Sequence, residues 1–313
     1  MERNTRMLIT GAKGMLGQNL CEVLTDAGFQ NLLTPSSAEL DLRDMSEVKA
    51  YVQKHKPKSL FHLAARVGGI KANMLHPAEF LRDNLLMDSA VMGAAHEAGI
   101  EKVIVMGSSC MYPRLCPQPM KEEMLLTGVP EPTNEGYAIA KIAVAKLCQY
   151  HNVQYGMNCL ALIAPNLYGI HERFDPDHSH VISSLIMKFH AAVSEGRKSV
   201  EMWGTGSARR EFLFARDMAE GLLWAMENLN ASDLDVPYIN VGSGSDVSIL
   251  ELADIMRSIS GFDGEIIWDT TKPDGMPQKL MDSSRATERG WKAKTSLQDG
   301  IRQTYDYYRS LQS

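Results

Sequence analysis

The sequence feature that most constrains the fold is a glycine-rich turn near the N-terminus. A short apolar run, residues 6–10, stops at the segment Gly11-Ala12-Lys13-Gly14-Met15-Leu16-Gly17, and residues 18–27 continue with helical spacing. Strand, glycine turn and helix in this order are typical of a dinucleotide site, because glycines permit a tight turn and let pyrophosphate approach the helix N-terminus. The spacing G-x-x-G-x-x-G is moderately specific, and a glycine turn without a ligand is the alternative.

Strand-like and helical segments alternate through the first half of the chain. Further apolar runs follow at residues 31–34, 59–64, 102–107 and 157–163, separated by helical stretches at 46–54, 77–98 and 136–151. This alternation predicts an α/β fold with a doubly wound parallel sheet of the Rossmann type. Ligands of such sheets lie beyond the carboxyl ends of the strands, so one crevice is expected to gather Gly11, Ala64-Ala65, Gly107-Ser108 and Asn166.

The chain beyond Asn166 has a different pattern. Loops rich in Asp, His and Pro come first, and helices are expected at 180–195 and 248–260, with a buried strand at 238–241 and a Pro/Gly-punctuated loop at 272–285. We therefore expect a dinucleotide-binding domain of residues 1–165, which residues 212–242 rejoin. Residues 166–211 and 243–313 should form a smaller, interleaved substrate-binding lobe.

Composition excludes several classes of function. The 32 basic and 38 acidic residues give a net charge of −6, which lacks the general electrostatic footprint of a nucleic-acid-binding protein. No apolar run approaches the ~20 residues that span a bilayer, and the N-terminus is polar, so we expect no membrane partner and a cytoplasmic location. The five cysteines are scattered without paired C-x-x-C spacing, which argues against disulfides and a zinc site.

A phenol and an ammonium stand four residues apart in a predicted helix, at Tyr137 and Lys141. Positions i and i+4 share a helix face, so both side chains can enter one site. A nearby cation favours the phenolate, which would make the pair a tunable proton donor or acceptor and suggests an oxidoreductase. The alternative is an amphipathic helix with a half-buried tyrosine and a surface lysine.

Ser108 and Cys110 directly follow the predicted strand 102–107. If the segment stays extended, both side chains project to one side of the sheet while Ser109 turns away. A thiol acts as a base only as thiolate, with its pKa lowered by neighbouring positive charge. The alternative is that Cys110 is a small buried residue.

The end of the second predicted strand bears on the choice of cofactor. NAD-binding folds usually carry an acid about 20 residues past the last glycine, whereas Ser36 and Ser37 stand here. No carboxylate at these positions repels a 2′-phosphate, and Lys13 can pair with it, so NADPH is the predicted cofactor. Glu39 is close enough to keep NADH as the alternative.

A group of imidazoles and carboxylates also raises the question of a metal. It comprises His171, Asp175, Asp177, His178 and His180, but its spacing matches no metal-binding pattern, and we expect no metal. The simplest interpretation of His180 is that it opens a helix, with Ser179 as a possible cap.

Several segments together closely resemble the GDP-L-fucose synthase family of the extended short-chain dehydrogenase/reductase superfamily. They are GAKGMLG, His62-Leu63-Ala64-Ala65, Arg66-Val67-Gly68-Gly69-Ile70, GSSCMYP, PTNEGYAIAK, Asn166-Leu167-Tyr168-Gly169, SHVI at 179–182, WGTG at 203–206, RREF at 209–212 and KPDGMPQKLMD at 272–282. The resemblance covers nearly the whole chain.

The resemblance implies two reactions in one site: epimerisation of GDP-4-keto-6-deoxy-D-mannose at C3 and C5, then reduction of its C4 ketone by NADPH to give GDP-L-fucose. It implies catalytic roles for Tyr137 as proton donor, Lys141 as its partner, Ser108 as oxyanion donor, Cys110 as base and His180 as acid. The implied cofactor contacts are Gly11, Ala12, Lys13, Gly14, Met15, Leu16, Gly17, Asp41, Leu42, Leu63, Ala64, Ala65, Met106, Gly107, Ser108, Ser109, Tyr137, Lys141, Ala164, Pro165, Asn166, Leu167 and His180. The implied contacts of the GDP-sugar are Asn166, Lys188, Trp203, Arg210, Asp274 and Lys279.

Two alternatives remain open at this point. One is an enzyme for a related GDP-4-keto-6-deoxy sugar, such as a heptose, or one that reduces without epimerising. The other is a dinucleotide sensor without turnover, although a sensor has no use for an acid and a base. Analogy within the superfamily also suggests a homodimer.

Overall fold

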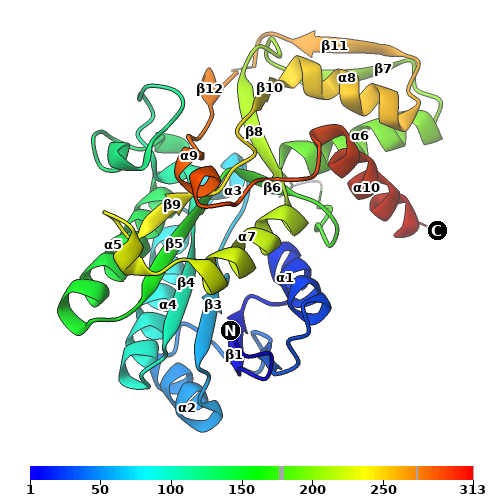
Figure 1. Cartoon of the computed structure of the whole chain (residues 1–313). Helices are drawn as coiled ribbons and strands as arrows, with labels where there is room; N and C mark the ends of the chain where they lie inside the picture. Colours follow the sequence, from blue (N-terminus) through cyan, green and yellow to red (C-terminus); the bar gives the residue numbers. More distant parts are fainter. Residues whose placement is uncertain (176–179, 273, 313) are drawn as a thin grey trace.

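The computed structural model describes residues 1–175, 180–272 and 274–312, and a six-stranded parallel sheet forms its centre (Figure 1). Its strand order is β2-β1-β3-β4-β5-β9. The strands are β1 (Met7–Thr10), β2 (Leu32–Leu33), β3 (Ser59–His62), β4 (Lys102–Ser108), β5 (Cys159–Ala164) and β9 (Tyr238–Asn240). The expected doubly wound parallel sheet is confirmed. β9 pairs in parallel with β5, so a segment late in the chain completes the sheet.

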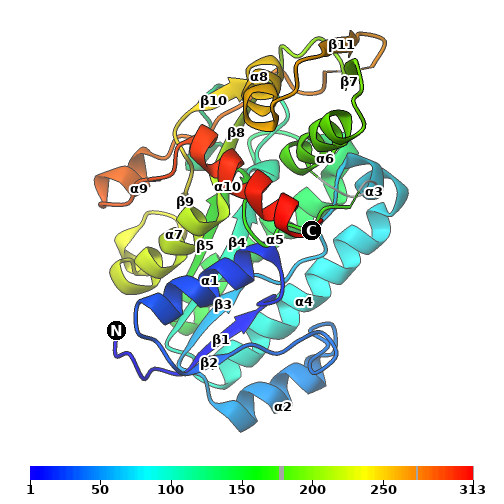
Figure 2. The ribbon, with the colours of Figure 1, turned by 90° about the vertical axis from the view of Figure 1, so that its right-hand side faces the viewer.

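Helices cover both faces of this sheet, as Figure 2 shows. One apolar layer joins the sheet to α1 (Met15–Asp26) and α7 (Ala215–Asn228). The other joins it to α2 (Met45–His55), α4 (Pro77–Glu97) and α5 (Glu135–Tyr155). Strands β1, β3 and β5 are buried along their whole length, which explains why they are short apolar runs without alternation.

A second lobe is built around β8 (Arg209–Phe214). This strand pairs with β6 (Asn166–Tyr168) and β12 (Gln278–Lys279) in parallel and with β10 (Asp246–Ser248) antiparallel. A separate pair joins β7 (Ser199–Trp203) to β11 (Glu265–Asp269). Helices α6 (Val181–Ser194), α8 (Ile249–Ser260) and α10 (Leu297–Ser310) pack around a third apolar cluster. The two lobes adjoin where β5 leads directly into β6.

Short elements complete the chain and correct two expectations. The segment 272–285, expected to be a loop, contains β12 and the start of α9 (Ser284–Glu288). Residues 109–111, expected to stay extended, form a 3₁₀ turn instead, and similar turns lie at Glu122–Met124, Pro132–Asn134 and Ala231–Asp233. The helix α3 (Ile70–Leu75) was not expected. No helix within the described ranges has the length and apolar character needed to cross a membrane.

Candidate functional site

The glycine turn between β1 and α1 is packed so tightly that two of its glycines cannot carry a side chain. A Cβ on Gly11 would lie 2.7 Å from the backbone nitrogen of Ala64, and Gly11 also has a positive φ of 72°. A Cβ on Gly17 would lie 2.2 Å from the Gly11 carbonyl oxygen, whereas one on Gly14 would meet that oxygen at 3.4 Å. The first and third glycines therefore close the turn, and Gly14 leaves its outer surface open.

The N-terminus of α1 offers hydrogen-bond donors to an anion. Its cap residue is Gly14, and no side chain among the described residues caps the first turn. The backbone N–H groups of this turn and the positive end of the helix dipole suit a pyrophosphate. A cavity of about 390 Å³ adjoins the turn and is lined by Ala12, Lys13, Gln18, Cys21, Glu22, Leu32 and Thr34. These features fit a dinucleotide cofactor.

The loop after β2 contains Glu39, the carboxylate that keeps NADH as the alternative cofactor. Both the backbone N–H and the hydroxyl of Ser36 donate to the Glu39 carboxylate, at 2.8 and 2.7 Å. These bonds, assisted by the charge of Lys13, lower the pKa of Glu39. Lys13 and an ionised Glu39 thus lie within electrostatic range of each other at the expected position of the adenosine ribose.

Asp41 and Leu42, predicted to contact the cofactor, lie in the loop between β2 and α2. Arg43 binds the Asp41 carboxylate in a bidentate pair of 2.9 and 2.7 Å, which lowers the pKa of Asp41 to about 2. Arg43 is a basic residue near this end of the sheet that the sequence analysis did not single out.

Neighbouring strands end together on one edge of the sheet. β3 ends at His62, β4 at Ser108 and β5 at Ala164, and registered pairing joins β3 to β4 and β4 to β5. This edge therefore carries most of the remaining cofactor residues predicted from sequence: Leu63, Ala64, Ala65, Met106, Gly107, Ser109, Pro165 and Leu167. Asn166 begins β6, and its amide donates to the Glu211 carbonyl oxygen at 3.1 Å.

A buried polar chain beneath this edge fixes the backbone after β3. Thr10 Oγ1 lies 2.7 Å from His62 Nδ1, and His62 Nε2 lies 2.8 Å from Asp88 Oδ1. Thr10 Oγ1 also accepts a bond from the Ala64 N–H at 3.4 Å. This chain holds Ala64 against Gly11, where the turn is tightest.

The 3₁₀ turn after β4 brings Ser108 and Cys110 together in a different way from the one expected. Ser108 caps the turn, and its Oγ accepts a bond from the Cys110 N–H at 3.3 Å. Ser109 is buried, whereas Ser108 and Cys110 are half-buried. Ser108 and Cys110 are therefore neighbours because the Ser108 side chain caps the turn that contains Cys110. They are not neighbours through the alternation of side chains along an extended strand.

The Cys110 sulfur has two further polar neighbours, from distant parts of the chain. Asn134 Nδ2 donates to Sγ at 3.1 Å, and Lys279 Nζ lies 3.5 Å from it. Burial raises the pKa of the Cys110 thiol, but the Lys279 charge and hydrogen bonds with Ser108, Lys279 and Asn134 outweigh burial and lower it. Asn134 is a site residue that the sequence analysis did not assign, although it stands within the PTNEGYAIAK segment.

Tyr137 and Lys141 lie on one face of α5, as the i and i+4 spacing predicts. The Lys141 ammonium is 5.9 Å from the centre of the Tyr137 ring, and Lys141 is nearly fully buried. The expected lowering of the tyrosine pKa is wrong. Burial and the Cys110 charge raise the pKa of Tyr137, and a hydrogen bond with Ser108 opposes them only in part. The phenol is therefore a proton donor rather than a base.

His180 is exposed at the start of α6, where it is the cap residue. Within the described ranges, no hydrogen bond joins its ring to Ser108, Cys110 or Tyr137. Ser179, Asp177 and His178 lie outside the described residues, so neither the predicted cap nor the full metal-like group is described. Among the residues that are described, no cluster of three or more possible metal ligands occurs.

The predicted GDP-sugar contacts lie on several elements of the second lobe. Lys188 on α6 is exposed and donates to the Glu201 carbonyl oxygen at 3.3 Å. Trp203 at the end of β7 is 64% exposed, with the Lys272 ammonium 5.7 Å from its ring centre. Arg210 donates to the Met276 carbonyl oxygen at 2.6 Å.

Asp274 has a local partner as well. Its carboxylate accepts bonds from the backbone N–H and the hydroxyl of Thr205, at 2.6 and 2.8 Å. Its Oδ1 lies 2.3 Å from the position that a Cβ on Gly204 would occupy, so the glycine is needed for this contact. Asp274 therefore orders the WGTG turn in the chain as described.

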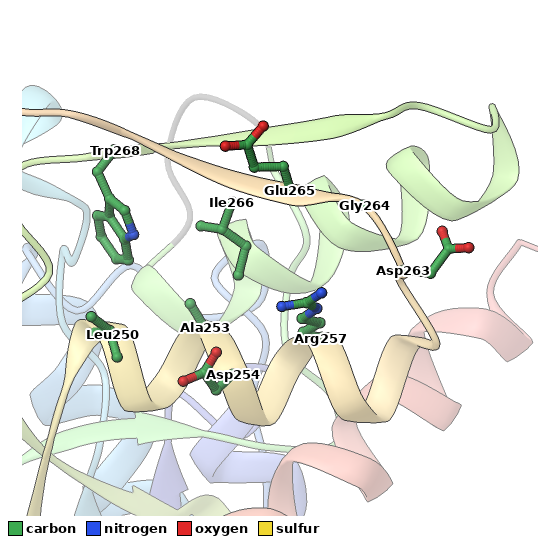
Figure 3. A pocket seen from close by; sticks show the side chains of 9 residues that line it. All are labelled: Leu250, Ala253, Asp254, Arg257, Asp263, Gly264, Glu265, Ile266 and Trp268. Atoms are coloured by element: carbon green, nitrogen blue, oxygen red, sulfur yellow. The ribbon is translucent and has the colours of Figure 1, made fainter.

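A cavity in the second lobe lies away from these residues. It holds about 550 Å³ between α8 and β11, where Leu250, Ala253 and Arg257 face Ile266 and Trp268 (Figure 3). None of the residues predicted from sequence lines this cavity. Cavity size alone therefore does not identify a reactive site, and the Ser108, Cys110 and Tyr137 cluster remains the candidate.

Comparison with known proteins agrees with this arrangement. Residues 7–242 match the NAD dependent epimerase/dehydratase family. A GDP-L-fucose synthase of Arabidopsis thaliana is 42% identical over 307 residues, which cover 98% of this chain and 94% of that protein. Among solved structures, a GDP-6-OMe-4-keto-L-xylo-heptose reductase from Campylobacter jejuni is 35% identical with a TM-score of 0.95, covering 99% of each chain.

A second solved structure is similar over the same length. It is a GDP-mannoheptose C4 reductase from Campylobacter jejuni with NADP bound, 36% identical with a TM-score of 0.92, again covering 99% of each chain. These matches span both lobes and all the segments quoted above. The chain therefore belongs to the NAD dependent epimerase/dehydratase family and, within it, to the group that contains the GDP-L-fucose synthases.

Proposed function

We propose that the chain converts GDP-4-keto-6-deoxy-D-mannose to GDP-L-fucose by epimerisation at C3 and C5 and reduction at C4. The observation that carries this proposal is the cluster at the carboxyl end of β4, where a thiol of lowered pKa lies beside a hydroxyl and a protonated phenol. A base and two oxyanion donors are the groups that proton exchange next to a ketone requires.

In the epimerisation, the Cys110 thiolate removes a proton from the carbon next to the C4 ketone. The electron pair moves into the carbonyl, and Ser108 and Tyr137 donate hydrogen bonds to the oxygen as it becomes negative. His180, at the start of α6, is assigned to return a proton from the opposite face. The same oxyanion donors serve C3 and C5, because both carbons adjoin one carbonyl.

In the reduction, NADPH would supply the hydride for C4 when bound. Tyr137 donates the proton that the C4 oxygen needs, and its raised pKa keeps that proton in place at neutral pH. Lys141, buried on the same helix face, would hold the nicotinamide ribose. The start of α1 would receive the pyrophosphate, and Lys13 would pair with the 2′-phosphate.

The two lobes divide these tasks. We assign the dinucleotide to residues 1–165 with 215–242, and the sugar nucleotide to residues 166–214 and 243–313. The return to the first lobe, expected at residue 212, begins at 215, because residues 212–214 complete β8 of the second lobe. Asn166, Lys188, Trp203, Arg210, Asp274 and Lys279 are the residues we assign to the GDP-sugar. In the described structure Arg210 and Asp274 bond within their own lobe, so substrate binding there would require these contacts to be shared or exchanged.

A second candidate is a C4 reductase for a related GDP-keto-heptose, with or without epimerisation. The observation that favours it is the high structural similarity to the two Campylobacter jejuni heptose reductases described above. The presence of Cys110 with a lowered pKa favours the epimerising enzyme, since a pure reductase does not need a base.

Deuterium exchange separates these possibilities. Incubation with GDP-4-keto-6-deoxy-D-mannose in deuterated water, without NADPH, should place deuterium at C3 and C5, detected by mass spectrometry and NMR. Cys110→Ser should abolish this labelling and retain NADPH binding, whereas the matched control Cys116→Ser should label normally. If the wild-type enzyme incorporates no deuterium but still oxidises NADPH with the keto-sugar, it is a simple reductase. If it shows neither activity with any GDP-keto-sugar, it is a dinucleotide sensor.

We further propose a cytoplasmic homodimer. The five cysteines are all free, which fits a reducing compartment. Exposed apolar side chains on α4 and α5, among them Leu86, Ile139 and Val153, provide a surface on which a second copy can pack. Sedimentation equilibrium should give twice the mass of the 34.7 kDa chain, and a monomer at micromolar concentration would contradict the dimer.

A further inference from the structure

Lys279 reaches the Cys110 sulfur from 169 positions away in the sequence. The segment around Lys279 is hydrogen-bonded on two sides, to β8 and to the loop that follows Cys110. β12, which contains Lys279, pairs with β8, and the Met281 N–H donates to the buried Glu211 carboxylate at 2.9 Å. A lysine on so constrained a backbone has a restricted range, and its ammonium lies 3.5 Å from Sγ.

On its second side, the Lys279 segment is hydrogen-bonded to the loop that follows Cys110. The Leu280 N–H donates to the Gln118 side chain at 2.8 Å, and the Met120 N–H donates to the Leu280 carbonyl oxygen at 2.7 Å. The Asp282 N–H returns a bond to the Met120 carbonyl oxygen at 2.8 Å. The thiol and the ammonium are thus carried by two segments that are bonded directly to each other.

The groups facing the sulfur come from three elements. The cap of the 3₁₀ turn provides the Ser108 hydroxyl, and the start of α5 provides the Asn134 amide and the Tyr137 phenol. β12 provides Lys279, whose charge is the largest influence that lowers the pKa of the thiol. Among the described residues, the titratable neighbours are therefore the Lys279 ammonium and the Tyr137 phenol of raised pKa, so a negative charge on sulfur faces a positive charge and a neutral group.

The hydrogen bonding of the Asn134 amide also favours a negatively charged sulfur. Its Nδ2 donates to the sulfur, whereas its Oδ1 is buried and has no hydrogen-bond partner within the part of the chain that the structure describes. An unpaired buried acceptor costs free energy. A strong hydrogen bond from Nδ2 to a negatively charged sulfur would offset that cost. A neutral thiol is too weak an acceptor to offer that compensation.

We propose that Lys279 and Asn134 hold Cys110 as a preformed thiolate in the resting enzyme, and that Lys279 is a positioning residue for the base rather than only a contact of the GDP-sugar. The inference rests on the proposed function, in which Cys110 is the base. Epimerisation then begins from an ionised sulfur, without prior removal of the thiol proton by another group.

Alkylation of Cys110 by iodoacetamide tests this without any turnover, because the thiolate is the reactive form. The rate for the Cys110 peptide is followed by mass spectrometry from about pH 5 to about pH 10, a range that spans the ordinary thiol pKa near ~8.5. The wild-type midpoint should lie below neutral pH, because a preformed thiolate must already be ionised there. In Lys279→Met it should rise by about one unit, which slows alkylation ~10-fold well below the midpoint. Lys279→Arg should keep most of the shift, and Asn134→Ala should show a smaller rise.

Cys21 serves as an internal reference, since its alkylation should be the same in every variant. An equal midpoint for Cys110 in wild type and Lys279→Met would overturn the proposal. So would a Lys279→Met variant that raises only the KM for the GDP-sugar, which is the result expected of a simple substrate contact. If Lys279→Met does not fold, the difference in thiolate absorbance between wild type and Cys110→Ser gives the wild-type midpoint directly, and a midpoint above neutral pH would refute the preformed thiolate.

The alkylation result is independent of the proposed reaction. A midpoint that moves in Lys279→Met while wild-type enzyme incorporates no deuterium would support the preformed thiolate and refute the epimerisation. Deuterium incorporation together with an unmoved midpoint would support the reaction and refute the role of Lys279.

Discussion

Replacing Gly17 by alanine should destabilise the protein, because its Cβ would enter the closed side of the dinucleotide turn. That atom would lie 2.2 Å from the Gly11 carbonyl oxygen and 2.6 Å from the Ala12 Cα, and both neighbours are backbone atoms. Relief requires a shift of roughly 1 Å between the turn and α1. Overpacking of this kind costs about 3 kcal/mol.

The magnitude can be measured as a shift in melting temperature. In a chain of this size, 1 kcal/mol corresponds to roughly 2 °C, so Gly17→Ala should lower the Tm by about 6 °C. Gly14→Ala is the matched control: its Cβ would meet only the Gly11 oxygen, at 3.4 Å, and its φ of −79° suits alanine. Loss of a glycine cap costs about 1 kcal/mol or less, hence about 2 °C.

The two variants should separate again when cofactor is added. The control places a methyl group on the open surface of the turn, where the pyrophosphate is expected, so NADPH should stabilise Gly14→Ala less than wild type. Scanning calorimetry without and with NADPH, together with a fluorescence titration, measures both effects. Equal melting temperatures for Gly14→Ala and Gly17→Ala in the absence of cofactor would refute the packing argument.

Three further predictions concern single side chains. Lys102→Met should lower the free energy of unfolding, measured by urea titration, by about 3 kcal/mol, because it removes a buried ammonium that donates to three carbonyl groups at the end of α7. A change within experimental error would show that these hydrogen bonds are not needed. Lys13→Ala should raise the KM for NADPH ~10-fold and change that for NADH little, and an equal effect on both would remove Lys13 from the 2′-phosphate site. Burial raises the pKa of Tyr137, so its proton remains as pH rises, and the pre-steady-state rate of hydride transfer should stay constant from about pH 6 to about pH 9; a decline in that window would contradict the assignment.

Much of the fold follows from short-range patterns in the sequence. The order of strand, glycine turn and helix at residues 6–27 and the apolar runs at β3, β4 and β5 predict the doubly wound sheet. The four-residue interval between Tyr137 and Lys141 also predicts correctly that they share a helix face. These patterns depend on local periodicity and backbone geometry, which a sequence states directly.

Other local features were less predictable. The 3₁₀ turn at Ser109–Met111 replaces an expected extended segment, since the Ser108 side chain caps the backbone there. β12 has only two residues, and it exists because β8 offers an edge to pair with. Short elements of this kind carry little periodicity, so their formation depends on the partner rather than on their own composition.

The sequence by itself therefore determined the sheet, the dinucleotide turn and the side chains proposed to react. Only the tertiary structure decided their chemical state. It placed Lys279 and Asn134 on the Cys110 sulfur and buried Tyr137, so that the thiol pKa falls while the phenol pKa rises. The physical reason is that a pKa depends on charges, hydrogen bonds and solvent within a few ångströms, and here those neighbours come from segments far apart in the chain.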